Sequence, residues 1–292
     1  MAWLLWFGLI LCLLLVAVLG LGAYGTKRWA NTVQTLIREL DAARIDDRAQ
    51  SLSPSHYDPR ELEGLPAPVQ RYFRTVLTEG QPLVAVAMVE MAGRFNLSAT
   101  AEQWKPFTST QRVVTRRPGF LWDAQIVMLP GVPVRVVDSY IAGQGRLRAA
   151  ALGLFTVADI CGGGEIARGE FMRYFAEATW YPTALLPSQG VRWQAVDEHS
   201  AHATLEDSPL ALTLLFRFND AGLIDSFRAE ARAAVVGKET VMLPWEGKLS
   251  NYQMTHGGMT VPHSAEVAWV WPEGHRTYFT GTVSALRYEF SL

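Results

Sequence analysis

Charged side chains are scarce in this sequence. Lys, Arg, Asp and Glu make up 18% of the 292 residues, whereas about 25% is usual in a soluble domain. The net charge is only −2, and the Lys and Arg residues form no basic stripe. Because nucleic-acid recognition relies on clustered positive charge, we expect no nucleic-acid partner. Hydrophobic residues, at 49% of the chain, instead indicate a membrane segment together with a large core or an apolar cavity.

Cysteine and the signature motifs of common enzymes are also scarce or missing. The two cysteines, Cys12 and Cys161, lie in an apolar run and in the middle of the chain, so no disulfide framework is expected. Gly162-Gly-Gly164 is not followed by Gly-Lys-Ser/Thr, which excludes a Walker P-loop. A glycine turn ahead of a helix can still hold an anion, but a flexible turn is the favoured interpretation. The nucleophile elbow Gly-x-Ser-x-Gly is missing too, and we expect no cofactor.

A long hydrophobic run occupies the N-terminus. No charged residue occurs from Trp3 to Ala23, and a helix of about twenty residues spans roughly the 30 Å of a bilayer's hydrocarbon core. A cleaved signal peptide, the alternative, has a basic start and a shorter apolar core. We therefore expect an uncleaved transmembrane anchor over residues 1–26. Lys27 and Arg28 follow at once, and the positive-inside rule then places the rest of the chain on the cytoplasmic side.

Helical periodicity continues after the anchor. Apolar residues recur at three- and four-residue steps between 27 and 49, as on one face of a helix. Breaker residues follow in Ser51–Pro59, and a second short helix is expected to begin near Pro66. We therefore divide the chain into the anchor, a juxtamembrane helix and linker over 27–64, and a single globular domain over 65–292.

Period-two alternation dominates the globular domain. Leu210–Phe218 and Phe227–Ala233 alternate side chains as half-buried antiparallel strands do, and Asn219–Gly222 between them has the composition of a hairpin turn. In the second strand the charged residues, Arg232 among them, are expected to face solvent. Further strands are expected near 83–95, 109–116, 120–128, 132–140, 143–150, 191–196, 201–206, 239–252, 263–271 and 277–290.

One helix, over residues 166–178, is expected to interrupt the strands, and no alternation of strand and helix is present. This pattern predicts an α+β fold that is mainly antiparallel β. A twisted sheet of about ten strands must curl or close, so we expect a half-barrel-like sheet with a few amphipathic helices. A curled sheet of this kind leaves an apolar hollow, a common location for ligands.

Three motifs carry a resemblance to a known family. They are Arg-Arg-Pro-Gly-Phe-Leu-Trp-Asp at 116–123, Trp-Tyr-Pro-Thr-Ala-Leu-Leu-Pro at 180–187 and Pro-Trp-Glu-Gly at 244–247. Together they resemble a bacterial domain family of unknown function over roughly residues 65–290, which brings no reaction with it. More weakly, the order Pro-Gly-Phe-Leu-Trp, Asp138 and Gly143 is similar to that of LolA-type lipoprotein carriers. That resemblance implies a curled half-barrel with helices over an apolar hollow.

Aromatic and charged residues are the candidates for binding a ligand in such a hollow. The aromatic candidates for its lining are Phe120, Trp122, Tyr174, Trp180, Trp269 and Trp271. Trp269 and Trp271 lie two apart on one expected strand and so share one face. Arg173 and Glu177 are candidates to meet a polar head group. The alternative is plain core packing for most of the aromatic residues and a solvated helix face for the charged ones.

Carboxylates offer a catalytic alternative. Asp123, Asp138 and Glu170 are the residues that a membrane-anchored hydrolase would use for acid–base work, although aspartates at strand ends more often cap turns. His199 and His202 have a ligand-like spacing but lack a third partner in any recognised motif, so no metal site is expected.

These observations favour a non-enzymatic function. We expect a membrane-tethered domain that binds a hydrophobic ligand, either a lipid or an acyl chain, with the membrane itself as a partner. A hydrolase and a scaffold that docks a membrane partner through a flat apolar patch remain the alternatives.

Overall fold

The thirteen strands of the described chain belong to one sheet. The computed structural model describes residues 2–46, 54–98, 101–129, 131–236 and 239–291. Neighbouring strands are antiparallel, and their order is β6-β5-β4-β3-β2-β1-β13-β12-β11-β10-β9-β8-β7. The strands are β1 (Val84–Asn96), β2 (Trp104–Val114), β3 (Gly119–Leu129), β4 (Val132–Ile141), β5 (Gln144–Ala151), β6 (Phe155–Gly162), β7 (Arg192–Asp197), β8 (Ser200–Asp207), β9 (Leu210–Phe218), β10 (Ile224–Val236), β11 (Glu239–Met254), β12 (Thr260–Trp271) and β13 (Gly274–Phe290).

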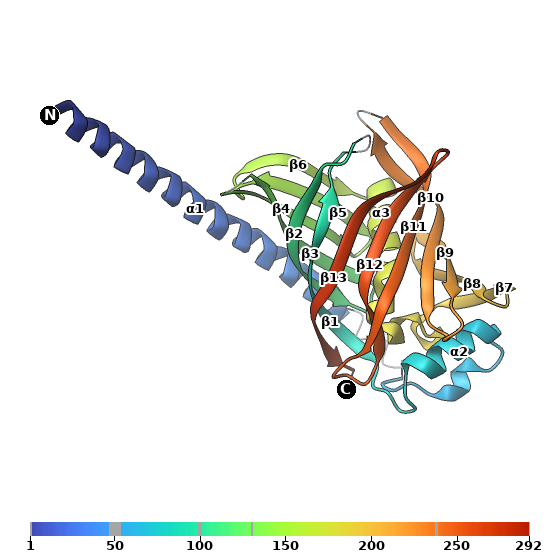
Figure 1. Cartoon of the computed structure of the whole chain (residues 1–292). Coiled ribbons are helices and arrows are strands. Elements are labelled where there is room, and N and C mark those ends of the chain that lie inside the picture. The colour runs from blue at the N-terminus through green and yellow to red at the C-terminus, as the bar shows by residue number, and fades with distance from the viewer. Residues whose placement is uncertain (1, 47–53, 99–100, 130, 237–238, 292) are drawn as a thin grey trace.

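The strand order follows from a simple chain path. Strands β1 to β6 are consecutive neighbours that form one wing, β7 to β13 form the other, and β1 pairs with β13 to join the wings. The joined sheet twists and curls without closing, so that β6 and β7 are its two edges (Figure 1). The mainly antiparallel, half-barrel-like α+β fold expected from the sequence is confirmed. The connection from β6 to β7 must run from one edge of the sheet to the other.

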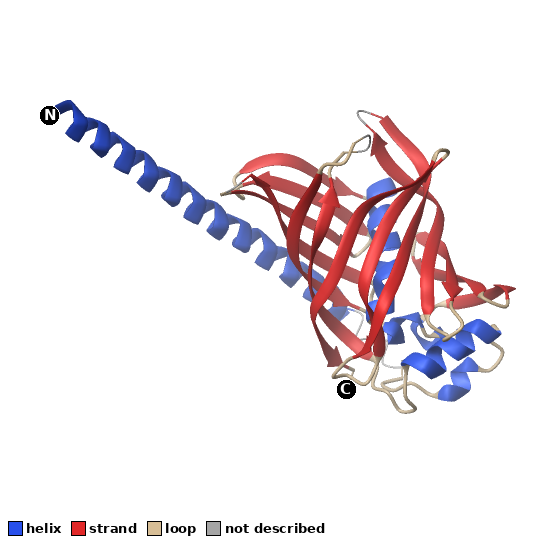
Figure 2. Cartoon of the chain, viewed as in Figure 1, coloured by secondary structure: helices blue, strands red, loops and turns tan. Residues whose placement is uncertain are grey.

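Helix α3 (Gly164–Glu177) lies in that connection and fills the inside of the curl. It contacts β3, β4 and β5 of one wing and β9 and β10 of the other, and Figure 2 shows it enclosed by strands. Phe171, Tyr174 and Phe175 are buried, and Tyr140 of β4 stacks on Phe171 with 5.0 Å between ring centroids. The connection continues through three short 3-10 helices, η3 (Ala178–Trp180), η4 (Pro182–Leu185) and η5 (Pro187–Gln189).

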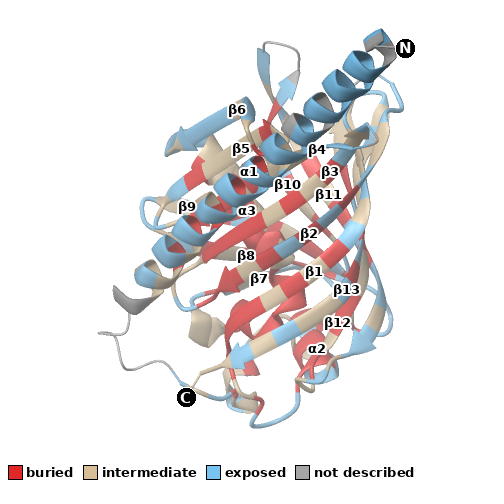
Figure 3. Cartoon of the chain, turned by 90° about the vertical axis from the view of Figure 1, so that its left-hand side faces the viewer, coloured by how far each residue is buried: buried red, intermediate tan, exposed pale blue. Residues whose placement is uncertain are grey.

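Helix α1 (Ala2–Asp46) is unbroken, but its two halves differ. The C-terminal half lies across the convex face of the sheet (Figure 3), where Trp29, Leu36 and Leu40 are buried against β1 to β5. This packing explains why β1 is buried on both of its faces near its start. In the N-terminal half the described apolar side chains are exposed, and the helix is long and apolar enough to cross a membrane.

Helix α2 (Ala67–Val76) packs at the lower end of the sheet in Figure 1. Its buried residues Val69, Tyr72, Phe73 and Val76 form the apolar face that the sequence periodicity predicts, and the helix expected near Pro66 is confirmed. The 3-10 helix η2 (Pro59–Leu62) precedes it. The helix expected over 166–178 is confirmed as α3.

Other local features test the sequence expectations more closely. The hairpin turn at Asn219–Gly222 is confirmed, because Asn219 Oδ1 accepts a hydrogen bond from the backbone N–H of Leu223 at 3.0 Å. Strand β6 was not expected. The helix expected over 27–49 is present through Asp46, and the residues after it, 47–53, lie outside the described part of the chain.

A bulge in β10 overturns one expectation. The register between β10 and β11 shifts between Ala229 and Arg232, and an extra residue in one strand reverses the face on which the following side chains lie. Arg232 therefore lines the interior of the curl. The prediction that it faces solvent with the other charged residues of its strand was wrong.

Candidate functional site

A largely apolar hollow remains between α3 and the concave face of the sheet. Its volume is about 470 Å³, within the usual range for ligand pockets of about 300–1,000 Å³. Both wings of the sheet contribute to its walls, and α3 closes one side. The apolar lining consists of Phe95, Leu147, Ile160, Ile166, Ala233, Val235, Trp245, Val267, Trp269, Tyr278 and Phe279.

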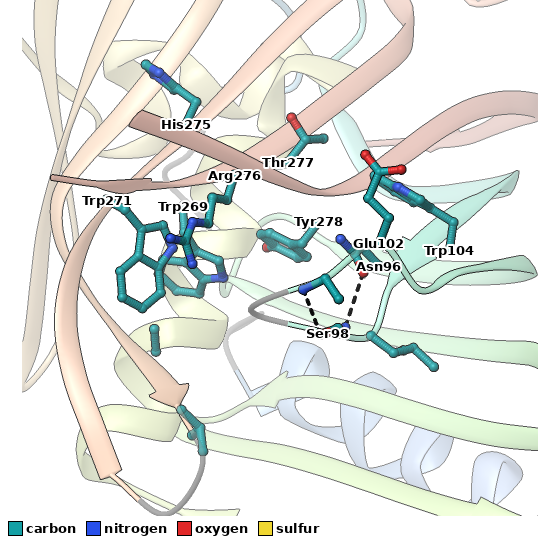
Figure 4. A pocket seen from close by; sticks show the side chains of 14 residues that line it. Asn96, Ser98, Glu102, Trp104, Trp269, Trp271, His275, Arg276, Thr277 and Tyr278 are labelled. Carbon is teal, nitrogen blue, oxygen red and sulfur yellow. Dashed lines mark hydrogen bonds between the residues drawn. The ribbon is translucent and has the colours of Figure 1, made fainter. Parts of the chain in front are cut away.

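A second pocket of about 570 Å³ adjoins this hollow, and the two share Val235, Trp269 and Tyr278 as wall residues. It lies between the end of the β1–β2 hairpin and the β12–β13 turn and has a more polar lining (Figure 4). The guanidinium of Arg276 lies 4.8 Å from the ring centroid of Trp271. The more polar pocket therefore borders the apolar hollow along β10, β12 and β13.

A charged network forms the floor of the hollow. Arg173 of α3 donates hydrogen bonds to Asp138 Oδ2 of β4 at 2.9 Å and to Glu177 Oε1 at 2.7 Å. Gln111 Nε2 of β2 donates to the other oxygen of Glu177 at 2.6 Å. The side chains of Arg173, Asp138 and Glu177 are each only 14–15% exposed. The network therefore ties α3 to two strands of one wing at buried positions.

Aromatic rings hold the Arg173 guanidinium from its other side. It lies 4.7 Å from the ring centroid of Trp122 and 5.2 Å from that of Phe120, distances typical of cation–π contacts. Burial alone would lower the pKa of Arg173, but Glu177, Asp138 and Glu170 together raise it above its ordinary value. Arg173 is therefore a permanent buried cation.

Two carboxylate oxygens of this floor lack a hydrogen-bond partner among the described residues. They are Glu170 Oε2 and Asp138 Oδ1, both buried. Burial first, and then the neighbouring charge of Asp138, raises the pKa of Glu170 to about 8. Burial also raises the pKa of Asp138, while Arg173 opposes that rise. Glu170 thus holds a proton at neutral pH, and the two carboxyls influence one another.

Arg232 supplies a second cation at the wall of the hollow. Its guanidinium lies 4.3 Å from the ring centroid of Trp245 and 5.7 Å from that of Trp269. It also packs against α3 at Gly169, where an added Cβ would lie 3.6 Å from Arg232 Nε. Sequence reasoning missed this residue because the bulge that turns it inward has no signal in the alternation of polar and apolar residues.

The structure separates the candidate binding residues into two groups. Arg173, Glu177 and Trp269 line the hollow, and Trp271 lines the adjoining pocket together with Trp269. The others, Phe120, Trp122, Tyr174 and Trp180, are buried in the core below the hollow. A solvated face is wrong for three charged residues of α3, because Glu170 is 5% exposed and the side chains of Arg173 and Glu177 point into the curl.

The candidate catalytic carboxylates are also separated. Asp138 and Glu170 meet at the floor of the hollow, but Asp123 lies on the convex face, where its Oδ1 accepts a hydrogen bond from Trp29 Nε1 of α1 at 2.8 Å. Among the residues that the structure describes, no group of three or more His, Cys, Asp and Glu side chains is placed to hold a metal ion.

The chain belongs to the family of unknown function DUF6920, whose model matches residues 63–288. The family resemblance carried by the sequence motifs is thereby confirmed. No curated protein matches the sequence.

The solved structures similar to this chain include the following two. A putative outer membrane lipoprotein-sorting protein domain from Vibrio parahaemolyticus is 10% identical, with a TM-score of 0.39, and the match covers 71% of this chain and 87% of that one. A β-barrel-like protein of the domain family DUF1849 from Brucella abortus is 10% identical, with a TM-score of 0.20, over 71% of this chain and 98% of that one.

Proposed function

We propose that this protein is tethered to a membrane by α1 and binds a hydrophobic ligand, a lipid or an acyl chain, in the hollow, without transforming it chemically. The observation that carries the proposal is the hollow itself. Protein interiors are normally close-packed, yet about 470 Å³ remains open between α3 and the sheet, with aromatic and aliphatic side chains around it. Transfer of an acyl chain into such a space contributes about 0.8 kcal/mol per buried CH₂.

The membrane part of the proposal rests on α1. From Trp3 to Tyr24 the described apolar side chains are exposed, and no other part of the described chain covers them. A lipid bilayer provides the apolar surroundings that this half of the helix lacks. Lys27 and Arg28 follow the apolar run and support a cytoplasmic position for the globular domain through the positive-inside rule.

A substitution at Gly169 tests whether the hollow is the binding site. The glycine lies inside α3 and borders the hollow. A Cβ there makes only ordinary contacts, so Gly169→Ala fits and should stabilise the helix by about 0.5–1 kcal/mol. A leucine at the same position extends into the space that the ligand needs. Gly169→Ala is therefore the matched control for Gly169→Leu.

Native mass spectrometry of the intact protein, released from nanodiscs made with its own membrane, measures the bound ligand. We expect a lipid-sized adduct on the wild type and on Gly169→Ala and its loss from Gly169→Leu, with thermal unfolding to confirm that both variants are folded. The proposal is refuted if the wild type carries no adduct or if Gly169→Leu carries the same adduct at the same occupancy.

A hydrolase remains the second candidate because Asp138 and Glu170 converge at the floor of the hollow. Binding is favoured over hydrolysis for two reasons. Asp138 is already engaged by Arg173, and no Ser, Cys or His is among the described residues that line the hollow. Release of fatty acid from lipid esters by the wild type, and its loss in Glu170→Gln, would support the hydrolase instead.

A further inference from the structure

The floor of the hollow offers hydrogen-bond acceptors that nothing in the described chain uses. Glu170 Oε2 and Asp138 Oδ1 are both buried without a partner, whereas buried polar atoms are bonded in the great majority of cases. Leaving such an atom without a partner destabilises the folded protein. In the ionised form both atoms are acceptors only, so the group that completes the floor in that form is a hydrogen-bond donor.

The charges on the floor define that donor further. At the floor three carboxylates, Asp138, Glu170 and Glu177, face two guanidiniums, Arg173 and Arg232. A further carboxylate, Glu165, also lines the hollow, but it is exposed to solvent and lies outside this balance. With every group at the floor ionised, three negative carboxylates face two positive guanidiniums, so the floor carries one uncompensated negative charge. Burying an uncompensated charge is expensive, so the missing partner is a monovalent cation.

The proton on Glu170 is the cation that balances the floor when the hollow is empty. Burial and Asp138 raise the pKa of Glu170 to about 8, which means that the carboxyl is largely protonated at pH 7. A ligand cation that binds there displaces this proton, and the charge of the floor stays at zero before and after binding.

An anionic head group fits this floor less well. It would add a negative charge beside Asp138 and Glu177, which are already the salt-bridge partners of Arg173. The remaining cation, Arg232, is held against the faces of Trp245 and Trp269 and against α3 at Gly169. The charge of Arg232 already compensates one carboxylate of the floor, so it is not left over for an anionic ligand. An ionised carboxylate ligand also donates no hydrogen bond, so Glu170 Oε2 and Asp138 Oδ1 stay without a partner.

We infer that the hollow binds amphiphiles whose polar end is an ammonium group, which donates hydrogen bonds to Glu170 Oε2 and Asp138 Oδ1 while the chain lies along the aromatic walls. This inference rests on the proposed function, because it assigns a head group to the ligand of the same hollow. The ammonium is carried either by a simple alkylamine or by an ethanolamine phospholipid.

Three dodecyl compounds that differ only in their polar end test the inference. Dodecylamine, dodecanol and dodecanoate are titrated against the full chain in lipid nanodiscs that contain a bound fluorescent acyl dye. Each compound is measured on the wild type, on Glu170→Gln and on Glu206→Gln, so that partitioning into lipid cancels. Glu206 is a control that removes one negative charge from an exposed position on β8.

We expect the wild type and Glu206→Gln to bind dodecylamine at least about tenfold more tightly than dodecanol, since a charge-assisted hydrogen bond at a buried site contributes about 1.5–3 kcal/mol. Glu170→Gln should bind the two alike and keep its affinity for dodecanol. The inference is overturned, with the proposed function intact, if the wild type binds all three compounds equally or if Glu170→Gln keeps the preference for the amine. If none of the compounds displaces the dye, the proposed function itself fails.

Proton release gives a second measurement that needs no variant. Calorimetric titration of the wild type at pH 7 in buffers of different ionisation enthalpy should show about one proton released per dodecylamine bound and none per dodecanol. Uptake of a proton, or no exchange with dodecylamine, overturns the inference. Lauroyl lysophosphatidylethanolamine distinguishes the two sources: dye displacement that is lost in Glu170→Gln assigns the ammonium to a phospholipid head group, and displacement by dodecylamine alone assigns it to a simple amine.

Discussion

Removal of the Arg173 guanidinium should destabilise the protein strongly. Arg173→Met keeps the apolar part of the side chain but deletes the bonds to Asp138 Oδ2 and Glu177 Oε1 at 2.9 and 2.7 Å. Glu177 retains Gln111 as a partner, whereas Asp138 becomes a buried carboxylate without any. Breaking a buried ion pair in this way costs about 3–5 kcal/mol, which corresponds to a fall of roughly 6–20 °C in Tm for a domain of this size.

Thermal unfolding of the full chain in nanodiscs, followed by tryptophan fluorescence, measures the effect. The double variant Arg173→Met/Asp138→Asn should be more stable than Arg173→Met alone, because it leaves no unpaired charge at position 138. The exposed ion pair between Arg192 and Glu206 provides the control, since Arg192→Met should cost less than about 1 kcal/mol. A loss below about 1 kcal/mol for Arg173→Met, or a double variant that is the less stable of the two, would contradict this account of the floor.

Three further predictions follow from burial and charge. Trp122→Ala should lower the stability by about 3–5 kcal/mol because Trp122 is 3% exposed in the core. Trp271→Ala should instead weaken binding of the fluorescent acyl dye with a smaller loss of stability, and a loss of stability equal to that of Trp122→Ala would show that Trp271 is a core residue. The pKa of Glu170 is raised from 4.5 to about 8 in the folded protein, so the folded state retains a proton that the unfolded state releases, and stability should fall between these pH values. Glu170→Gln should flatten that fall, with a gain on the order of a few kcal/mol at pH 8 and none near pH 4, and a parallel pH profile for the two proteins would exclude this cause. A phosphatase fusion at Leu292 should be inactive if the basic residues after the anchor hold the domain in the cytoplasm, and strong periplasmic activity would place it on the other side.

The sequence revealed every described strand except β6, together with the inserted helix, but not the direction in which the charged face of that helix points. A charged stripe on a helix has the same periodicity whether it meets water or a polar floor inside a sheet. Whether the charged face of α3 points inward or outward depends on how the chain crosses from β6 to β7. This crossing is necessary because β1 pairs with β13, and that pairing joins residues almost two hundred positions apart.

The candidate carboxylates show a similar limit. Asp138 pairs with Trp122 in the β3–β4 register, so both lie on the concave face, and Asp123 must then lie on the opposite face. The sequence contains both aspartates at the ends of apolar stretches, and only the register distinguishes them. Arg232 was missed because a bulge that moves one residue across the sheet leaves the pattern of residue types unchanged.

The unbroken course of α1 restricts what the domain is able to reach. The helix continues from its apolar half onto the sheet without a hinge, and at Gly25 its backbone lies directly against Leu152 and Leu154 at the β5–β6 turn. If the apolar half spans a bilayer, the sheet stands at a fixed height above the surface and is free only to spin about the helix axis, with the β6 edge nearest to the lipid. If the domain binds a ligand as proposed, it takes up and releases that ligand at one fixed height beside the membrane.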